Sequence, residues 1–303
     1  MPLSTDGGAP TGRLVLVATP IGNLGDLSPR AVDTLAGADL VCCEDTRRTR
    51  ALLSHAGVRV RALLAVHEHN EDRQAAAVAR RLQAGETVAL VTDAGTPGIS
   101  DPGALVVRAA LAAGASVSVV PGPNAAVAAL VASGLPADRF CFEGFLPRRG
   151  PARRQRLAAI AADERTTVVH EAPGRLVGTL ADLRDALGPE RPIAVVRELT
   201  KVHEEVWRGE VGDAAGAFAA RAAGDGVRGE IVVVIGGSPP ARGEPTDDEI
   251  ADALQGPLGA GTSVRDAAAA VAEALGVSRR RAYALALRGR NAEPGKDVDP
   301  GVT

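Results

Sequence analysis

The sequence predicts an α/β protein made of two successive α/β domains and a small all-helical unit. Short apolar runs alternate with helical stretches from residue 13 onward, a pattern typical of a parallel, doubly wound sheet. The block after residue 135 contains one long polar strand, which favours a mixed sheet with antiparallel members. Residues 246–290 have helical periodicity without strand patterns, which indicates a separate helical unit.

The N-terminal domain is expected over residues 13–135. Ser28, Asp101 and Asn124 precede helical stretches, and their side chains are good caps for helix N-termini. Pro29 and Pro102 then occupy the first helical position, where proline is tolerated. Expected strands lie at 14–19, 40–43, near Leu63, 88–91 and 116–120, and expected helices at 29–37, up to His55, 71–83, 102–113 and 124–133.

The second domain is expected over residues 136–237, and a Gly/Pro/Ser-rich linker separates it from the helical unit. Its expected strands are 140–145, 166–170, 193–196, 203–208 and 230–235, and its expected helices 174–187 and 214–223. Within the helical unit, residues 264–275, a turn at Gly276 and residues 278–287 resemble a helix-turn-helix, and a structural three-helix cap is the alternative. Residues 1–12 and 291–303 are expected to be flexible tails.

Composition restricts the classes of function. At 303 residues with 46% hydrophobic content, the chain is long enough for about two soluble domains. No apolar run reaches the length of a membrane span and no signal pattern opens the chain, so we expect a cytoplasmic protein with no membrane contact. Because the net charge is −3, any nucleic acid must bind local basic patches. The three cysteines have no metal-ligand spacing, and His67 and His69 are expected to be solvated, so no metal is predicted.

The loop after the strand at 88–91 is the first candidate ligand site. It contains Gly95, Pro97, Gly98 and Gly103, and open α/β sheets bind ligands in loops at the carboxyl ends of their strands. Its amides suit an anion, and Asp93 suits a hydroxyl or an amine. An ordinary connection between strand and helix is the alternative. The chain has neither G-x-G-x-x-G after its first strand nor a P-loop, which argues against a dehydrogenase and an NTPase.

Two charged segments also end apolar runs. Glu44-Asp-Thr-Arg-Arg48 follows the second strand, where acids and arginines could bind a phosphate or orient a hydroxyl. Arg197-Glu-Leu-Thr-Lys201 follows the strand at 193–196. Lys201 is one of only two lysines in an arginine-rich chain, which indicates a site that rejects the bulkier guanidinium. Solvated, paired charges are the alternative for both segments.

Six motifs, in order from about Arg13 to Gly237, carry a resemblance to a known family. The chain is similar to the tetrapyrrole methylase superfamily and, more closely, to its ribosomal RNA small subunit methyltransferase I branch. The motifs are Thr19-Pro-Ile-Gly-Asn-Leu-Gly-Asp26, Glu44-Asp-Thr-Arg47, Thr92-Asp-Ala-Gly-Thr-Pro97, Pro121-Gly-Pro-Asn-Ala-Ala126, Phe142-Glu-Gly-Phe-Leu-Pro147 and Arg197-Glu-Leu-Thr-Lys201.

The resemblance implies two domains of tetrapyrrole-methylase type with S-adenosylmethionine (SAM) bound in the cleft between them, in a homodimer. It implies 2′-O-methylation of a cytidine ribose in 16S rRNA, in the decoding region of the small ribosomal subunit. Ala94 interrupts the family's Gly-Asp-Pro loop, and Asn124 stands where the family often has a hydroxyl. The implied cofactor-binding residues are Pro20, Asp93, Gly95, Thr96, Pro97, Ser100, Asn124, Ala125, Glu230 and either His170 or Glu171.

Methyl transfer to a ribose hydroxyl needs in-line placement and a group that deals with the hydroxyl proton. We expect Lys201 to stabilise a developing alkoxide, or to act as a base if burial lowers its pKa. Glu198, Asp45 and Glu171 are the other catalytic candidates. The expected RNA contacts are Arg47, Arg48, Glu143, Arg148, Arg149, Arg153, Arg154 and Arg197.

Other functions remain open from the sequence. A tetrapyrrole-precursor C-methyltransferase and a diphthine-synthase-like enzyme keep the same fold and donor, and a non-catalytic RNA-binding assembly factor belongs to a different class. The arginines near the C-terminus, from Arg279 to Arg290, favour RNA over a tetrapyrrole. With only six aromatic residues, recognition is expected to use the RNA backbone and shape and not base stacking.

Overall fold

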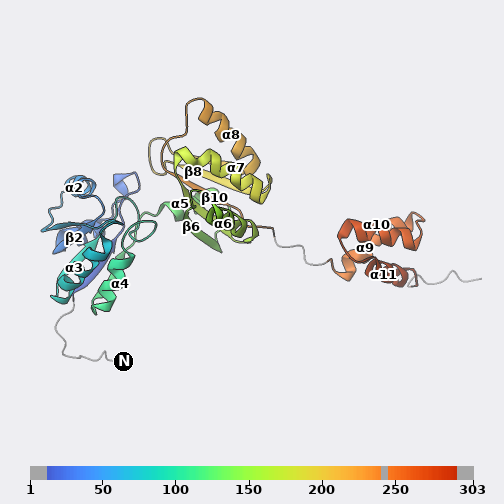
Figure 1. Cartoon of the computed structure of the whole chain (residues 1–303), viewed down its shortest axis with the longest axis horizontal. Coiled ribbons are helices and arrows are strands. Elements are labelled where there is room, and N and C mark those ends of the chain that lie inside the picture. The colour runs from blue at the N-terminus through green and yellow to red at the C-terminus, as the bar shows by residue number, and fades with distance from the viewer. Residues whose placement is uncertain (1–11, 240–244, 292–303) are drawn as a thin grey trace, which may run out of the picture. The chain divides into compact units, whose positions relative to one another are not determined.

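A computed structural model describes residues 12–239 and 245–291 (Figure 1). These residues form two compact units, one up to Ser238 and one from Pro239 onward. The first unit contains two five-stranded sheets. We call residues 12–124 the N-lobe and residues 125–238 the C-lobe. Within the described residues, no helix combines the length and the apolar character that crossing a membrane requires.

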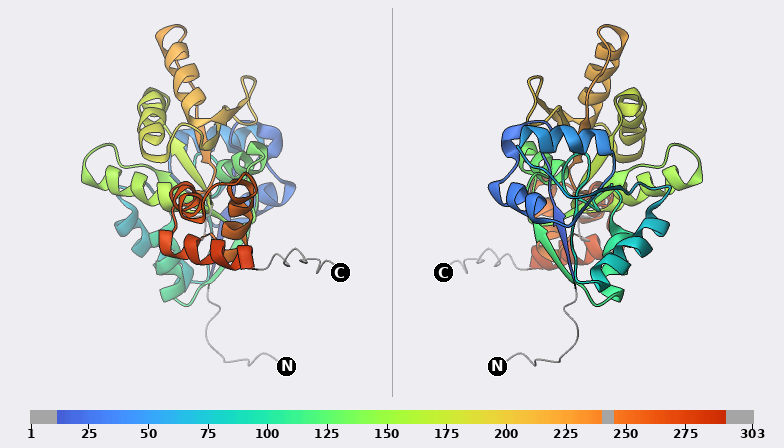
Figure 2. Two further views of the ribbon diagram at one scale, coloured as in Figure 1. Left: turned by 90° about the vertical axis from the view of Figure 1, so that its right-hand side faces the viewer. Right: turned by 90° about the vertical axis from the view of Figure 1, so that its left-hand side faces the viewer.

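The N-lobe is the predicted parallel, doubly wound sheet, with strand order β3-β2-β4-β1-β5. Helices α1 and α2 pack on one face, where Leu35 and Leu53 meet Val15 and Val41. Helices α3 and α4 cover the other face (Figures 1 and 2). The elements are β1 Arg13–Val17, α1 Pro29–Gly37, β2 Leu40–Cys43, α2 Thr46–His55, β3 Leu63–Ala65, α3 Glu71–Gln83, β4 Thr87–Leu90, α4 Ala104–Ala112 and β5 Ser116–Val120, with a short 3-10 turn at Leu24–Asp26.

The predicted start of the fourth helix is wrong. Helix α4 begins at Ala104, and Asp101 makes no capping hydrogen bond to it. The carboxylate of Glu71, at the start of α3, instead accepts hydrogen bonds from the amides of Gly103 and Leu105 at 2.9 and 2.8 Å. A side chain from another helix therefore satisfies the exposed amides of α4, and Asp101 is left in the loop.

The C-lobe is the predicted mixed sheet, with strand order β6-β7-β10-β8-β9. Strands β6 and β7 are parallel, and the other neighbours are antiparallel. The elements are β6 Phe140–Phe145, α6 Pro151–Ala162, β7 Thr166–Glu171, α7 Leu176–Leu187, β8 Pro192–Arg197, β9 Glu205–Glu210, α8 Val211–Ala223 and β10 Ile231–Ile235, with a 3-10 turn at Pro173–Arg175.

Helix α5, Ala125–Ser133, follows the N-lobe in the chain but packs on the C-lobe sheet. Its Ala126, Ala129 and Leu130 contact Val168 and Val234, on the face opposite α6, α7 and α8. As predicted, Asn124 caps it by accepting a hydrogen bond from the amide of Val127. The chain therefore passes between the lobes at Asn124, and the predicted domain limit at residues 135 and 136 stays a prediction.

The second unit is the predicted small helical unit. It contains α9 Asp247–Gly259, α10 Val264–Leu275 and α11 Arg279–Asn291 around a core that includes Ile250, Val271 and Ala286. Thr246 and Glu249 form a capping box at the start of α9, which satisfies two terminal amides. Of the predicted tails, 1–12 and 291–303, all but residues 12 and 291 lie outside the described residues.

Candidate active site

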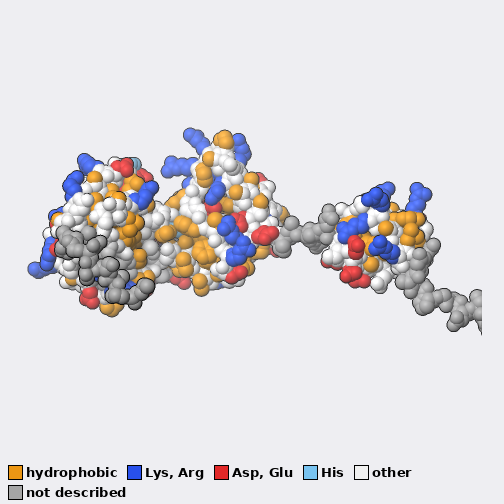
Figure 3. All heavy atoms as spheres, turned by 90° about the horizontal axis from the view of Figure 1, so that it is seen from below, with side chains coloured by type: hydrophobic (Ala, Val, Ile, Leu, Met, Phe, Trp, Pro, Cys, Tyr) orange, Lys and Arg blue, Asp and Glu red, His pale blue; other side chains and the backbone are white. Residues whose placement is uncertain are grey.

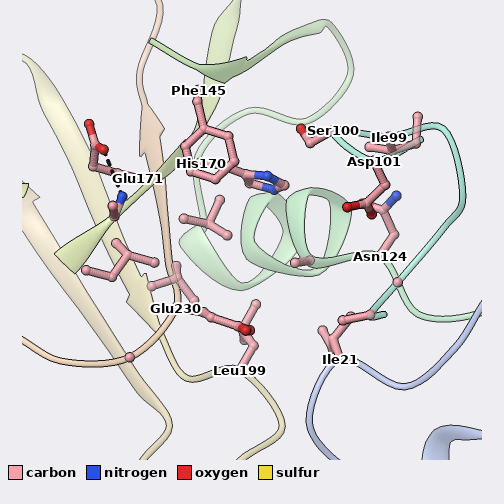
Figure 4. A pocket seen from close by; sticks show the side chains of 18 of the residues that line it. Ile21, Ile99, Ser100, Asp101, Asn124, Phe145, His170, Glu171, Leu199 and Glu230 are labelled. Atoms are coloured by element: carbon pink, nitrogen blue, oxygen red, sulfur yellow. Dashed lines mark hydrogen bonds between the residues drawn. The ribbon is translucent and has the colours of Figure 1, made fainter. Parts of the chain in front are cut away.

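A pocket of about 330 Å³ lies where the loops after the N-lobe strands face the C-lobe sheet. This volume falls in the range of small-molecule sites. We call it the main pocket. Figure 4 shows Asp101 and Asn124 on one side of it, with Phe145 and His170 across from them. Its other lining residues are Ile21, Ala94, Gly95, Thr96, Ile99, Ser100, Ala125, Glu171, Ala172, Pro173, Val196, Leu199, Gly229, Glu230, Ile231 and Val232.

The loop after β4 forms the N-lobe wall, and backbone hydrogen bonds hold it in place. Thr19 and Gly95 exchange two such bonds, at 2.9 and 3.0 Å, which tie the loop to the end of β1. The hydroxyl of Thr96 donates to the carbonyl of Pro123 at 3.1 Å. Gly95 has φ +87°, a left-handed conformation that favours glycine. These bonds anchor the predicted ligand loop, and Gly95, Thr96 and Ser100, which were predicted to bind the cofactor, line the pocket.

Carboxylates gather behind this wall. Burial raises the pKa of Asp101 to about 6, and the nearby Glu44 and Asp93 add to the rise. Burial also raises the pKa of Glu44, whose carboxylate accepts a hydrogen bond from Thr92 at 3.4 Å. Asp101 lines the main pocket. At neutral pH the pocket therefore presents a partly desolvated negative charge, a favourable partner for a cationic ligand.

In the C-lobe wall, two neighbouring residues of β7 point their side chains in opposite directions. The ring of His170 lies against Phe142 and Phe145 and points into the main pocket (Figure 4). Burial lowers the pKa of His170, so the ring is neutral at pH 7, and within the described residues its buried Nε2 has no hydrogen-bond partner. Glu171 points the other way, because successive side chains of a strand alternate between faces.

Glu171, predicted as a catalytic or cofactor-binding residue, lines the pocket, but its carboxylate points away from it. Its side chain is fully buried and forms an ion pair with Arg175 at 3.2 Å. It also accepts hydrogen bonds from Thr179, at 2.5 Å, and from the amide of Ala172, at 2.8 Å. These partners occupy both carboxylate oxygens on the helix-covered side of the sheet. Of the two alternatives that the sequence left open, His170 is the side chain that faces the pocket.

A second cavity of about 340 Å³, which we call the side hollow, adjoins the main pocket. Ile21, Ala94 and Glu230 line both cavities. The predicted residues Pro20 and Asp93 line the side hollow and not the main pocket. Its other lining residues are Thr19, Gly22, Leu24, Arg48, Thr49, Ala51, Leu52, Thr92 and Lys201. The predicted residue Pro97 lines neither cavity.

Lys201 is fixed at the edge of the side hollow. Its Nζ lies 2.8 Å from Glu198 and 3.1 Å from Glu230. Gly22 of the N-lobe approaches it so closely that a Cβ there would lie 2.5 Å from Cγ of Lys201. Burial acts to lower the pKa of Lys201, but its hydrogen bonds to Glu198 and Glu230 outweigh this, and the pKa is raised. The alternative of Lys201 as a base is therefore wrong, because the group stays protonated at neutral pH.

Three predicted RNA contacts belong to the scaffold of the C-lobe. Arg153 is buried and bonds Asp182, Thr179 and the carbonyl of Pro147. Arg197 bonds Glu205 and the carbonyl of Arg228. The side chain of Glu143 is only 7% exposed and pairs with Arg156. These predictions are corrected, because each charged group already has its partners within the lobe.

The remaining predicted charges take different positions. Asp45 caps α2 by accepting a hydrogen bond from the amide of Arg47 at 2.7 Å, and it lines neither cavity. Arg47, Arg148, Arg149 and Arg154 are exposed, as RNA contacts must be. The described part of the helical unit also has Arg side chains on its surface (Figure 3). Its exposed arginines include Arg265, Arg279, Arg280 and Arg288.

In the described residues, no group of His, Cys, Asp and Glu suits a metal ion.

Comparison with known families and proteins agrees with this arrangement. Residues 13–215 match the family Tetrapyrrole (Corrin/Porphyrin) Methylases. The chain belongs to this family. Residues 244–290 match the RsmI C-terminal HTH domain. This tetrapyrrole methylase is therefore a SAM-dependent methyltransferase, and the match covers the N-lobe and most of the C-lobe.

Proteins named Ribosomal RNA small subunit methyltransferase I are similar along almost their whole length. The one from Synechocystis is 44% identical, covering 91% of this chain and 98% of its own. The one from Mycobacterium tuberculosis is 45% identical, covering 96% and 99%. A crystal structure of uroporphyrin-III C-methyl transferase from Thermus thermophilus, complexed with S-adenyl homocysteine, covers 74% of this chain and 97% of its own at a TM-score of 0.52 and 23% identity. That structure supports the fold.

The main pocket of this tetrapyrrole methylase fits SAM. Among the described residues that line it, none is Lys or Arg, whereas Asp101 and Glu230 supply carboxylates suited to the cationic donor. The partnerless Nε2 of His170 can bond a polar group of the ligand. Ala125 is small, which leaves room beside Asn124 at the start of α5. We expect these residues and the loop from Ala94 to Asp101 to hold the donor.

Asp101 and Phe145 are among the pocket residues that sequence reasoning missed, each for a physical reason. Asp101 precedes a proline before a helical stretch, which is also the pattern of a helix cap, and the capping by Glu71 comes from a distant helix. Phe145 ends β6 and is 54% exposed, yet it lines the pocket. Its position beside the other phenylalanines of the segment was the available signal.

Proposed function

We propose that the chain transfers the methyl group of SAM to the 2′-hydroxyl of a cytidine ribose in 16S rRNA, in the decoding region of the small ribosomal subunit. Relatives along the whole chain are named rRNA small subunit methyltransferases, which supports the substrate class. One structural observation carries the chemistry. The protonated Lys201 stands in a hollow that shares a wall with the donor pocket.

SAM, when bound, supplies an electrophilic methyl group on a sulfonium. Lys201 stabilises the negative charge that develops on the hydroxyl oxygen, because a fixed cation in a partly desolvated site acts without reorganisation. Glu198 positions Lys201. The Glu198 carboxylate accepts a hydrogen bond from Nζ of Lys201 and another from the amide of Glu230, each at 2.8 Å. Glu230 lies on the wall between the two cavities, where its carboxylate accepts the hydroxyl proton.

The function is tested with SAM labelled in its methyl group. The acceptors are small ribosomal subunits, naked rRNA and a tetrapyrrole precursor. We expect label in the rRNA of the subunits, in a nucleotide whose 3′ linkage resists alkaline hydrolysis because its 2′-oxygen is methylated. Label in the tetrapyrrole precursor, in protein, or in an alkali-sensitive position would contradict the proposal. Binding of subunits without any transfer would favour an assembly factor.

Lys201 has its own prediction. Lys201→Ala removes the cation, and we expect the single-turnover rate of methyl transfer to fall by about 100-fold. Lys201→Arg keeps the charge but must fit a larger group beside Gly22, so we expect it to recover only part of the rate. SAM affinity by calorimetry is the control and should change little, because Lys201 does not line the main pocket. Near-normal rates in both variants would remove Lys201 from the mechanism.

We further propose a homodimer that acts in the cytoplasm, where ribosomal subunits are found. The outer face of α5 supports a self-contact, because Val127 and Val131 are 48% and 70% exposed one helical turn apart. Light scattering tests this interface. Val131→Asp should shift the protein toward a monomer, whereas Val202→Asp, at a position that is 96% exposed on a separate loop, should not. A monomeric wild-type protein would contradict the dimer.

A further inference from the structure

We propose that the side hollow is the acceptor site and that it takes a single unpaired nucleotide, with the base against its apolar wall and the backbone at Arg48. This inference rests on the proposed function, because it names how the RNA presents its ribose. The hollow is about as large as the main pocket, at about 340 against 330 Å³. Since the donor is itself a nucleoside derivative, a cavity of this size suits one nucleotide.

The position of the hollow favours an acceptor. It shares Ile21, Ala94 and Glu230 with the main pocket, so ligands in the two cavities would lie close together at these residues. Methyl transfer requires this proximity, since the reacting atoms must come within about 3–3.5 Å of each other. Lys201 bonds Glu230 at this wall. A ribose placed there meets the cation that the reaction needs.

The lining of the hollow has the two kinds of surface that a nucleotide requires. Leu24, Ala51 and Leu52 supply aliphatic area for the face of a base. Arg48 supplies a mobile cation for a phosphate, because its side chain is 68% exposed and its contact with Asp93 is long, at 3.5 Å. Asp93 itself stays anchored by the amide of Asp45 at 3.0 Å, so Arg48 can move without it.

The recessed form of the hollow favours an unpaired nucleotide over a duplex. It lies between the loop of Thr19 to Leu24 and the first turns of α2. A paired and stacked base shows only its edge, so it cannot place its face against Leu52. An extruded or single-stranded base can, at an unstacking cost of a few kcal/mol. A duplex would instead contact only the exposed arginines outside the hollow.

The first test fills the hollow. Leu52→Trp places an indole in the hollow and does not alter a residue of the main pocket. We expect SAM affinity by calorimetry within about two-fold of wild type and methyl transfer to small subunits at least about 100-fold slower. Leu111→Trp, on the exposed face of α4, is the matched control and should change neither. Ala51→Phe fills the same hollow and replaces Leu52→Trp if that variant fails to fold.

Two results of this experiment would overturn the inference. Wild-type transfer rates in folded Leu52→Trp and Ala51→Phe would show that the acceptor binds elsewhere. Loss of SAM affinity in both would show that the hollow is an extension of the donor site. If the wild-type protein methylates no RNA, the proposed function fails, and the binding experiment below still tests the hollow by itself.

The second test asks whether the side hollow requires an unpaired nucleotide. A short cytidine-containing RNA with a fluorescent label is compared as a single strand and annealed to its complement, with binding measured by anisotropy. We expect Leu52→Trp to weaken binding of the single strand by about ten-fold and to leave binding of the duplex unchanged, because only the single strand reaches the hollow. Equal weakening of both RNAs, or no change in either, would contradict an unpaired nucleotide in this cavity.

Discussion

The two lobes treat their buried charges in opposite ways. In the N-lobe, Asp101 at the main pocket and the nearby Glu44 have raised pKa values, so their ionised forms are disfavoured by the fold. In the C-lobe, Glu205 is held by Arg221 and Arg197, whose hydrogen bonds lower its pKa to about 2. Glu44 and Asp101 of the N-lobe therefore cost stability when they are ionised, while Glu205 of the C-lobe contributes to it. The difference indicates that the raised N-lobe carboxylates are held ready for a ligand, whereas the Glu205 cluster holds the C-lobe together.

Removal of a C-lobe carboxylate should have the largest effect. Glu171→Ala removes a buried carboxylate that pairs with Arg175 and accepts a hydrogen bond from the buried Thr179. We expect the free energy of unfolding to fall by about 3–5 kcal/mol, the usual cost of breaking a buried ion pair. Urea denaturation measures this loss, and calorimetry on the folded fraction should find SAM affinity nearly unchanged. A stable variant that no longer binds SAM would reverse the comparison between the lobes.

Two adjacent arginines of α6 sharpen the comparison. Arg153→Ala should lower the free energy of unfolding by about 2–3 kcal/mol, because it leaves Asp182 and Thr179 without a buried partner. Arg154→Ala, next to it and exposed, should stay within about 0.5 kcal/mol of wild type. Binding to small ribosomal subunits should show the reverse order. Arg154→Ala should affect this binding more than Arg153→Ala and should reduce its salt dependence. Equal stability of the two variants would show that Arg153 is not a scaffold residue.

Asp101→Asn tests the N-lobe side. The pKa of Asp101 is about 6 in the folded chain against an ordinary 3.8, so the folded chain binds more protons between these values. The free energy of unfolding therefore falls as pH rises through this window, and the variant should be more stable at pH 7, by about 1 kcal/mol after discounting for partial exposure. Thermal melts at pH 7 and below pH 4 measure this gain, which should vanish at the lower pH.

The same carboxylate should act on the donor in the opposite direction. SAM affinity of the wild type should fall as pH drops through about 6, because Asp101 loses its charge there. In Asp101→Asn we expect affinity about ten-fold weaker at pH 7 and no such pH dependence. Calorimetry over a pH series checks both statements. A pH-dependent loss that persists in the variant would assign the titration to another group.

His170→Phe should give the smallest effect. The substitution keeps a ring against Phe142 and Phe145 but removes the Nε2 that faces the pocket. We expect SAM affinity to fall by about three- to ten-fold, the equivalent of one hydrogen bond, with stability unchanged or slightly higher. Calorimetry and urea denaturation on the same preparation check this. Unchanged affinity would show that the donor leaves Nε2 without a partner.

The sequence predicted where the site lies better than which side chains face it. Strand ends and Gly-rich loops placed Gly95, Thr96 and Asn124 at the pocket, because parallel strands bring such loops to one edge. Side-chain direction was harder. The strand Thr166–Glu171 has no clear apolar and polar alternation, so its pattern could not decide between His170 and Glu171.

The partners of charged side chains were harder still to predict, because they depend on tertiary contacts. Arg153 and Arg154 are adjacent residues of the same type, so the sequence does not distinguish them. Only the packing of α6 against α7 buries Arg153 and leaves Arg154 exposed. The same holds for Asp101, whose capping role is taken by Glu71 from another helix. Lys201 was identified by its rarity, but its raised pKa required the positions of Glu198 and Glu230.

Glu230 stands in both cavities, and its carboxylate also bonds Lys201. Any ligand that draws this carboxylate to one side changes what the other side offers. Thermodynamic reciprocity then requires that donor and acceptor alter each other's affinity by the same factor. We therefore expect bound SAM to change the affinity for the acceptor nucleotide, and the bound nucleotide to change the affinity for SAM, through Glu230.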